Sequence, residues 1–181
     1  MRQETKITRY DRRLQRAEQL EKAFVDTFIS LGLWAHRIRG TTNQAPLLSV
    51  PQMDEKTRAP DLIVFKGTRY CLIEIKESLA EGQHFTLYSH QLRDYFTHLM
   101  NVPCLLVVCV SEGEYSGYIG CISLHRLREL IVLDQHREKV LIPVMALDYV
   151  GTYKQTQIRM MSRSIHRALD FFYPSSRSRN N

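Results

Sequence analysis

The sequence predicts an α/β fold in which helices flank a central mixed sheet, with the core order α-β-β-β-α-β. Three observations predict this fold class. A helical apolar period covers residues 10–33, a hairpin of two β-rich runs covers residues 61–76, and a continuous apolar run covers residues 102–110. A continuous apolar run of this length is typical of a strand that is buried on both faces of a sheet.

The length and composition are those of an ordinary globular protein. The chain has 181 residues, 44% hydrophobic and 24% charged, which suits one domain with a full core. We expect a single domain over residues 1–174 and a disordered polar tail over residues 175–181. The longest apolar run is far shorter than a membrane span, and the charged N-terminus does not resemble a signal peptide. These features predict a cytoplasmic, nucleoid-associated protein with no membrane partner.

The first helix is predicted over residues 10–33, where apolar residues recur at helical spacing and Gly32 supplies the end. Glu21 lies on the apolar stripe of this helix, whereas most other charges fall outside it. A carboxylate in that position needs a partner. Either it points toward a functional site, with Glu18 as the second candidate, or it pairs with Lys22 or an arginine.

Residues 34–40 alternate apolar and basic side chains, which predicts the first strand. Its basic residues Arg37 and Arg39 could contact phosphates where the strand emerges, although a solvated strand face is the common outcome. The following residues 44–58 contain Pro46 and Pro51 with weak periodicity. They predict a loop, with a short strand at residues 47–50.

The predicted hairpin is centred on Gly67. A glycine at the first central position suits a two-residue type II′ turn. This turn predicts the pairs Lys66 with Arg69, Phe65 with Tyr70, Ile63 with Leu72, and Asp61 with Glu74. The alternating side chains then leave one apolar face that should pack on the core, made of Leu62, Val64, Cys71, Ile73 and Ile75.

On the other face of the hairpin, Asp61, Glu74 and Lys76 lie together at the open end. Opposed carboxylates with Cβ atoms roughly 5 Å apart repel each other unless something neutralises them. A hard divalent cation such as Mg²⁺ or Mn²⁺ would do so, and Lys76 could hold a water or balance the charge of a phosphate. The alternative is a hairpin rim with solvated charges.

Beyond the hairpin, we expect a loop over residues 77–83 and a helix over residues 85–100. Gln91 and Tyr95 suggest a hydrogen-bonding pair of that helix at a cleft. The alternative is that Gln91 is a helix-boundary glutamine with no such role. Strands are expected at residues 102–110, 115–122 and 140–147, with a short helix at residues 124–132. The four scattered cysteines should be reduced core residues.

The C-terminal helix combines an apolar stripe with a basic row. Its apolar residues recur three and four positions apart and should dock on the core: Ile158, Met161, Ile165, Leu169 and Phe172. Arg159, Arg163 and Arg167 recur every four residues and line a separate ridge, which spans about 12 Å. This end of the chain supplies nearly the whole net charge of +6. The ridge either contacts the phosphates of a nucleic acid or keeps the protein soluble.

Pro60-Asp61, followed by Glu74-Ile75-Lys76, resembles the signature of the PD-(D/E)XK nuclease superfamily. Gln91 and Tyr95 match the Q-x-x-x-Y element of its RecB-like branch and of the nuclease part of type I restriction enzymes. The resemblance covers about residues 18 to 110. It implies a restriction-endonuclease-like fold and a metal-dependent deoxyribonuclease that acts on DNA, with Gln91 and Tyr95 touching the DNA backbone or ordering a water.

The resemblance also implies a metal site. Asp61, Glu74 and the carbonyl of Ile75 would hold Mg²⁺, for which Mn²⁺ can substitute, and Glu21 on the first helix would complete the set. Lys76 would position the attacking water. An endonuclease is favoured over an exonuclease, and a homodimer is compatible with the sequence. The alternative is a non-catalytic DNA-binding module, or a subunit of a larger restriction, repair or recombination complex.

Overall fold

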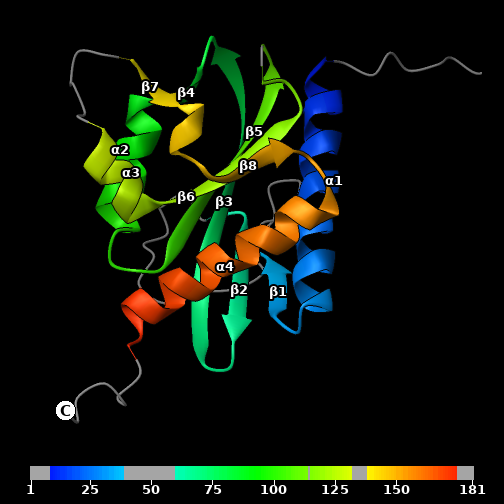
Figure 1. The fold of residues 1–181 in the computed structure, drawn as a ribbon, viewed down its shortest axis with the longest axis vertical. Coiled ribbons are helices and arrows are strands. Elements are labelled where there is room, and N and C mark those ends of the chain that lie inside the picture. The colour runs from blue at the N-terminus through cyan, green and yellow to red at the C-terminus, as the bar shows by residue number, and fades with distance from the viewer. Residues whose placement is uncertain (1–8, 39–59, 114, 132–137, 175–181) are drawn as a thin grey trace, which may run out of the picture.

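The computed structural model describes residues 9–38, 60–113, 115–131 and 138–174 (Figure 1). Within these residues, eight strands form one sheet. Six of them follow the order β1-β2-β3-β5-β6-β8, and β4 pairs with the end of β3 and with β7. The elements in chain order are α1 (Arg9–Ser30), β1 (Trp34–Arg37), β2 (Leu62–Lys66), β3 (Arg69–Glu81), β4 (His84–Tyr88), α2 (Ser89–His98), β5 (Cys104–Glu112), β6 (Tyr118–Ser123), α3 (Leu124–Leu130), β7 (Lys139–Pro143), η1 (Val144–Ala146), β8 (Asp148–Thr152) and α4 (Gln155–Phe172).

The predicted mixed sheet flanked by helices is confirmed. Strand β5 runs parallel to β3, and the other strand pairs are antiparallel. Helices α2 and α3 pack on one face of the sheet, and α1 and α4 pack on the other (Figure 1). Strand β5 is buried on both faces as predicted, because Leu106 and Val108 pack toward α2 and α3 while Leu105 and Val107 pack toward α1 and α4.

The hairpin has the predicted register from Lys66–Arg69 to Ile63–Leu72. Gly67 has a φ of 63°, and Thr68 is not among the residues with positive φ, as a type II′ turn requires. The ladder ends at Leu62–Ile73, so Asp61 lies one position before it. The predicted apolar face packs on the core, with Leu62, Val64, Cys71 and Ile73 fully buried.

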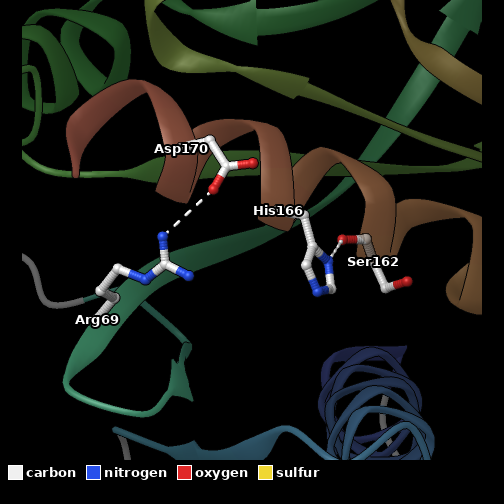
Figure 2. Close-up of polar contacts among 4 residues, drawn as sticks. All are labelled: Arg69, Ser162, His166 and Asp170. Carbon is white, nitrogen blue, oxygen red and sulfur yellow. Dashed lines mark hydrogen bonds and ion pairs between the residues drawn. The ribbon is translucent and has the colours of Figure 1, made fainter. Parts of the chain in front are cut away.

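The two long helices dock on the sheet through their predicted apolar stripes. In α1, Phe24 and Phe28 are buried, and Gly32 with a φ of 77° follows the helix end. In α4, the stripe from Ile158 to Leu169 is buried. An ion pair joins α4 to the hairpin, since Arg69 Nη1 lies 3.3 Å from Asp170 Oδ1 (Figure 2).

The prediction of a loop over residues 77–83 and of a helix from residue 85 is wrong. Strand β3 continues to Glu81, the chain turns at Gly82 with a φ of 57°, and β4 returns before α2 begins at Ser89. Buried Phe85 and Leu87 alternate with less buried neighbours, which is a strand period. The Ser78 hydroxyl joins the two strands, because it donates to the Thr86 carbonyl at 2.8 Å and accepts from the Thr86 amide at 3.1 Å.

The C-terminal third of the sheet also differs from the prediction. The strand expected at residues 140–147 ends at Pro143, and η1 and the unpredicted strand β8 follow. Strand β6 begins only at Tyr118, since the preceding residues form a turn closed by a bond from the Tyr118 amide to the Tyr115 carbonyl. The predicted loop at residues 44–58, its short strand and the tail at residues 175–181 lie outside the described residues. No helix in the described ranges is long and apolar enough to cross a membrane.

The cysteines are free, as predicted, but Cys109 is only half-buried and is not a full core residue. Cys71, Cys104 and Cys121 are buried, and burial raises the pKa of each thiol well above its usual range. They therefore act as core residues rather than as nucleophiles.

Candidate active site

Asp61 reaches across the open end of the hairpin with its side chain. Its backbone carbonyl accepts a hydrogen bond from the Ile38 amide at 2.9 Å, which fixes it beside the end of β1. Its Oδ2 accepts the Ile75 amide at 2.7 Å. The carboxylate thus takes the place of a backbone partner for β3, and this explains why the ladder does not extend to a regular Asp61–Glu74 pair.

Glu74 lies at the centre of a buried polar cluster. Lys76 Nζ is 2.5 Å from Glu74 Oε1, and the Tyr95 hydroxyl donates to the same oxygen at 2.8 Å. The Lys76 ammonium also lies over the Tyr95 ring, 5.8 Å from its centroid. Glu74 is 2% exposed, and its second oxygen, Oε2, is buried with no hydrogen-bond partner among the described residues. One oxygen of this carboxylate is therefore paired with an ammonium and a hydroxyl, and the other is buried without a hydrogen-bond partner among the described residues.

The electrostatics of Asp61 reflect the neighbouring carboxylate. Burial, and after it the charge of Glu74, raise the pKa of Asp61 to about 7, although the Ile75 amide and Lys76 oppose the shift. Two acids held this close share the cationic partner Lys76. An added cation would relieve the remaining repulsion.

A cavity of about 700 Å³ opens between α1 and the far halves of β3 and β5. Asp61, Ile75 and Lys76 line it from the hairpin, and Glu21 lines it from α1. Glu74 is not at its surface, but Lys76 connects the two because it lines the cavity and contacts Glu74. The hairpin motif therefore faces a space that can admit a ligand.

Glu21 meets both of the expectations for it, since it faces the cavity and also pairs with an arginine. It lines the cavity, and its Oε2 also lies 2.6 Å from Arg37 Nε. Burial raises the pKa of Glu21 above its usual value, although Arg37 opposes the shift. Glu18, the second candidate, is not among the lining residues. Arg37 is thus engaged with a carboxylate, while Arg39 lies outside the described residues.

The donor set fits a hard divalent cation in part. Within the described ranges, no group of three or more His, Cys, Asp or Glu side chains is arranged to hold a metal ion. Two carboxylates are nevertheless adjacent, and one of them has a buried oxygen without a partner. Carboxylate and carbonyl oxygens are the ligands that Mg²⁺ prefers, and this ion retains several waters when few protein ligands are offered. Asp61, Glu74 and the Ile75 carbonyl suit such a site. Glu21 would have to give up its ion pair with Arg37 to join them.

Gln91 and Tyr95 differ in how they relate to the cluster of Asp61, Glu74 and Lys76. Tyr95 is 3% exposed and reaches the site through its bond to Glu74. Gln91 is half-buried one turn earlier on α2, and no described hydrogen bond links it to Glu74 or Lys76. Neither residue lines the cavity. The Tyr95 hydroxyl therefore helps to fix the orientation of the Glu74 side chain.

The basic row of α4 is displayed as predicted. Arg159, Arg163 and Arg167 are all exposed, on the side of the helix away from its buried stripe. The cavity wall contains further residues that the sequence patterns did not indicate. Arg16 of α1 lines the same cavity as Glu21, and Tyr153 comes from the chain just after the unpredicted strand β8. The spacing of Arg16, five residues before Glu21, offered only a weak signal.

Comparison with known proteins gives similarities to solved structures alone. No protein-family model matches the chain, and no curated protein matches it. Among solved structures, the chain is similar to Hjc of Archaeoglobus fulgidus, a Holliday junction resolvase from an archaeal hyperthermophile, with a TM-score of 0.45 and 10% identity. The match covers 78% of this chain and 95% of that one. At this level the similarity does not assign a function to the chain.

Proposed function

We propose that this protein is a divalent-metal-dependent DNA nuclease that hydrolyses phosphodiester bonds as an endonuclease. The observation that carries the proposal is the cluster of Asp61, Glu74 and Lys76 beside an open cavity, with a buried carboxylate oxygen that lacks a partner. Closely placed acids with one lysine are poorly balanced by the protein alone. A cation and an anionic substrate together would balance them.

The chain's own residues have distinct parts in this proposal. Asp61, Glu74 and the Ile75 carbonyl would hold Mg²⁺, which Mn²⁺ can replace, with Glu21 as a further ligand. Bound Mg²⁺ supplies Lewis-acid stabilisation of the developing charge and acidifies a water. Lys76 lines the cavity, so its ammonium can donate to the attacking water or to a phosphate oxygen. The Tyr95 hydroxyl holds Glu74 in place.

DNA binding requires positive charge outside the site. The exposed row of Arg159, Arg163 and Arg167 supports contacts with successive phosphates, which position a backbone without reading bases. Arg16 at the cavity wall adds one cation next to the proposed reaction centre.

The direct test is to incubate the purified protein with plasmid, linear and branched DNA in Mg²⁺, Mn²⁺ or EDTA. We expect nicking or linearisation of the plasmid with either metal and none in EDTA. Digestion from linear ends alone would instead indicate an exonuclease. Binding without cleavage under every condition would refute the enzyme and favour a non-catalytic DNA-binding module.

A further inference from the structure

A second cavity, of about 380 Å³, lies between α3 and α4. It touches the first residues of β5, Cys104 and Leu105, whereas the candidate active site touches Cys109 and Val110 near the other end of the same strand. At roughly 3.3 Å per residue, the four residues of strand from Leu105 to Cys109 separate the two cavities by about 13 Å. The α3–α4 pocket is therefore distinct from the proposed reaction centre.

Aromatic rings form one wall of the α3–α4 pocket. The rings of His125, Phe171 and Phe172 lie with their centroids 5.2 to 5.3 Å apart. The His125 ring is fixed, because its Nε2 lies 2.9 Å from the Met100 carbonyl. Phe171 is 68% exposed, which leaves much of its ring without a partner. An exposed ring backed by fixed rings is a suitable platform for stacking a flat ligand.

The polar lining of the α3–α4 pocket is electrically balanced. Arg126 and Arg167 face the acids Glu129 and Asp148, and Arg126 Nη1 lies 2.6 Å from Asp148 Oδ1. The charges of the lining arginines and acids cancel, so an uncharged ring fits better than a phosphate.

One hydrogen-bonding group of the α3–α4 pocket is left over. Ser164 lines it and is 5% exposed. Its hydroxyl has no nitrogen or oxygen partner among the described residues, and its one partner there is the thiol of Cys121, a weak donor and acceptor. A buried hydroxyl in this state gains from a ligand that carries a hydrogen-bonding edge.

The α3–α4 pocket continues the basic row of α4. Arg159, Arg163, Arg167 and Phe171 are spaced four residues apart and form one ridge of the helix. Arg167 and Phe171 also line the pocket. The acid next to Phe171, Asp170, pairs with Arg69 of the hairpin (Figure 2), which partly neutralises its charge beside the row. A strand whose phosphates follow the arginines would bring its next base to the exposed ring.

We propose that the α3–α4 pocket binds an unpaired nucleobase of a DNA strand whose phosphates lie along the arginine row. The base stacks on Phe171 and hydrogen-bonds to Ser164, and a paired base in a duplex cannot do either. This inference rests on the proposed action on DNA and names its substrate class, which is DNA with an extrahelical or single-stranded nucleotide. Base stacking on an aromatic side chain tolerates any sequence, so the pocket selects for structure and not for sequence.

The test measures binding in EDTA, so that no cleavage is needed. The probes are a fully paired duplex and the same duplex with one bulged 2-aminopurine, with affinity read by fluorescence anisotropy and stacking read by quenching. We expect the wild-type protein to bind the bulged duplex roughly tenfold more tightly and to quench the 2-aminopurine. Phe171→Ala should lose most of this preference and the quenching, with an unchanged affinity for the paired duplex.

Matched variants separate stacking from other effects. Phe171→Trp should keep the preference, because it retains a stacking ring. Met160→Ala, which trims an exposed apolar residue of the same helix outside the pocket, should also keep it. Ser164→Ala should reduce the preference by a smaller factor than Phe171→Ala, with quenching retained.

An unchanged preference for bulged DNA in Phe171→Ala would overturn the inference. A shift from dimer to monomer in that variant on sedimentation, with the preference intact, would also overturn it, since Phe171 would then be a contact between copies of the chain. The outcome is independent of the nuclease proposal. A protein that prefers bulged DNA but never cleaves refutes only the nuclease, and one that cleaves with no Phe171-dependent preference refutes only the pocket.

Discussion

The cavities at the two ends of β5 differ in how their charges are balanced. At the α1 cavity, Asp61 has a pKa raised to about 7 by burial and by Glu74, and a buried oxygen of Glu74 has no partner among the described residues. At the α3–α4 pocket, the lining arginines and acids cancel and aromatic rings dominate. A site with uncompensated carboxylates attracts a cation, whereas a site with balanced charges favours a neutral ligand. We therefore assign the proposed chemistry to the α1 cavity and the proposed recognition of a base to the α3–α4 pocket.

The largest expected effect tests the chemistry of the α1 cavity. Lys76→Ala should lower the single-turnover rate of DNA cleavage by about 100-fold or more, because it removes the ammonium that, in the proposed mechanism, would face the reacting phosphate. DNA affinity should stay nearly the same. Lys66→Ala is the control, since this lysine is exposed on the same hairpin and should leave cleavage unchanged. Full activity in Lys76→Ala would remove the residue from the mechanism.

The next effect concerns the basic row that leads to the α3–α4 pocket. Replacing Arg159, Arg163 and Arg167 together with glutamine should weaken binding about equally for any DNA sequence and spare the buried stripe of α4. The slope of log K against log salt should shrink by about 2 to 3 units, since each lost phosphate contact removes roughly 0.9 of a unit. An unchanged slope would place the DNA path elsewhere on the molecule.

A smaller effect should distinguish Tyr95 from Gln91. Tyr95→Phe keeps the buried ring and removes only the hydroxyl that donates to Glu74, so cleavage should fall by roughly tenfold as Glu74 loses its fixed position. Gln91→Ala should change the rate by less, because no described hydrogen bond links Gln91 to Glu74 or Lys76. Equal losses in both variants would mean that Gln91 acts on the substrate directly. Single-turnover rates at saturating protein provide the comparison.

The smallest effects are on the stability of the metal-free protein. Glu74→Gln should lower the free energy of unfolding by about 1–2 kcal/mol, because it leaves the largely buried Lys76 without its ionic partner. Asp61→Asn should leave the free energy of unfolding unchanged or raise it by up to about 1 kcal/mol at pH 8, since the variant relieves the repulsion between Asp61 and Glu74. Urea denaturation in EDTA measures both. A clear loss of stability in Asp61→Asn would make Asp61 a structural residue.

The pH dependence of the unfolding free energy, compared between the wild-type protein and Asp61→Asn, sharpens this test. In the unfolded chain Asp61 ionises near its usual pKa of about 4, whereas the folded protein keeps the proton until about pH 7. The folded state thus binds more protons between these values, and stability from this group is lost as pH rises from about 4 to 7. The difference in unfolding free energy between pH 5 and pH 8 should therefore be smaller in Asp61→Asn. An equal difference in both proteins would show that Asp61 titrates normally.

The regions predicted correctly from the sequence are those with long, strong patterns. Gly67 with alternating flanks determined the hairpin register, and the three- and four-residue spacing of α4 determined its buried stripe. Strands β4 and β8 were missed because each has only five residues, which is too short a run to establish a strand period. The pairing of β4 with β7 and of β8 with β6 joins segments distant in sequence, which a local pattern cannot reveal.

The same limit applied to the sites. The motif brought Asp61, Glu74 and Lys76 together in the sequence analysis because one hairpin carries all of them. The bond between Tyr95 and Glu74, and the pairing of Glu21 with Arg37, depend on how α2 and α1 pack on the sheet. The α3–α4 pocket had no sequence signal, because its walls come from elements between Cys104 and Phe172.

The most direct test of the central claim is a Mn²⁺ titration that follows DNA cleavage and thermal unfolding in the same preparations. A metal that binds the folded state raises the melting temperature. We expect cleavage and stabilisation of the wild-type protein to reach half of their maximum at the same Mn²⁺ concentration, and Asp61→Asn to lose both responses. Cleavage without added metal, or equal stabilisation of Asp61→Asn by Mn²⁺, would contradict the assignment of this site as a metal-dependent nuclease centre.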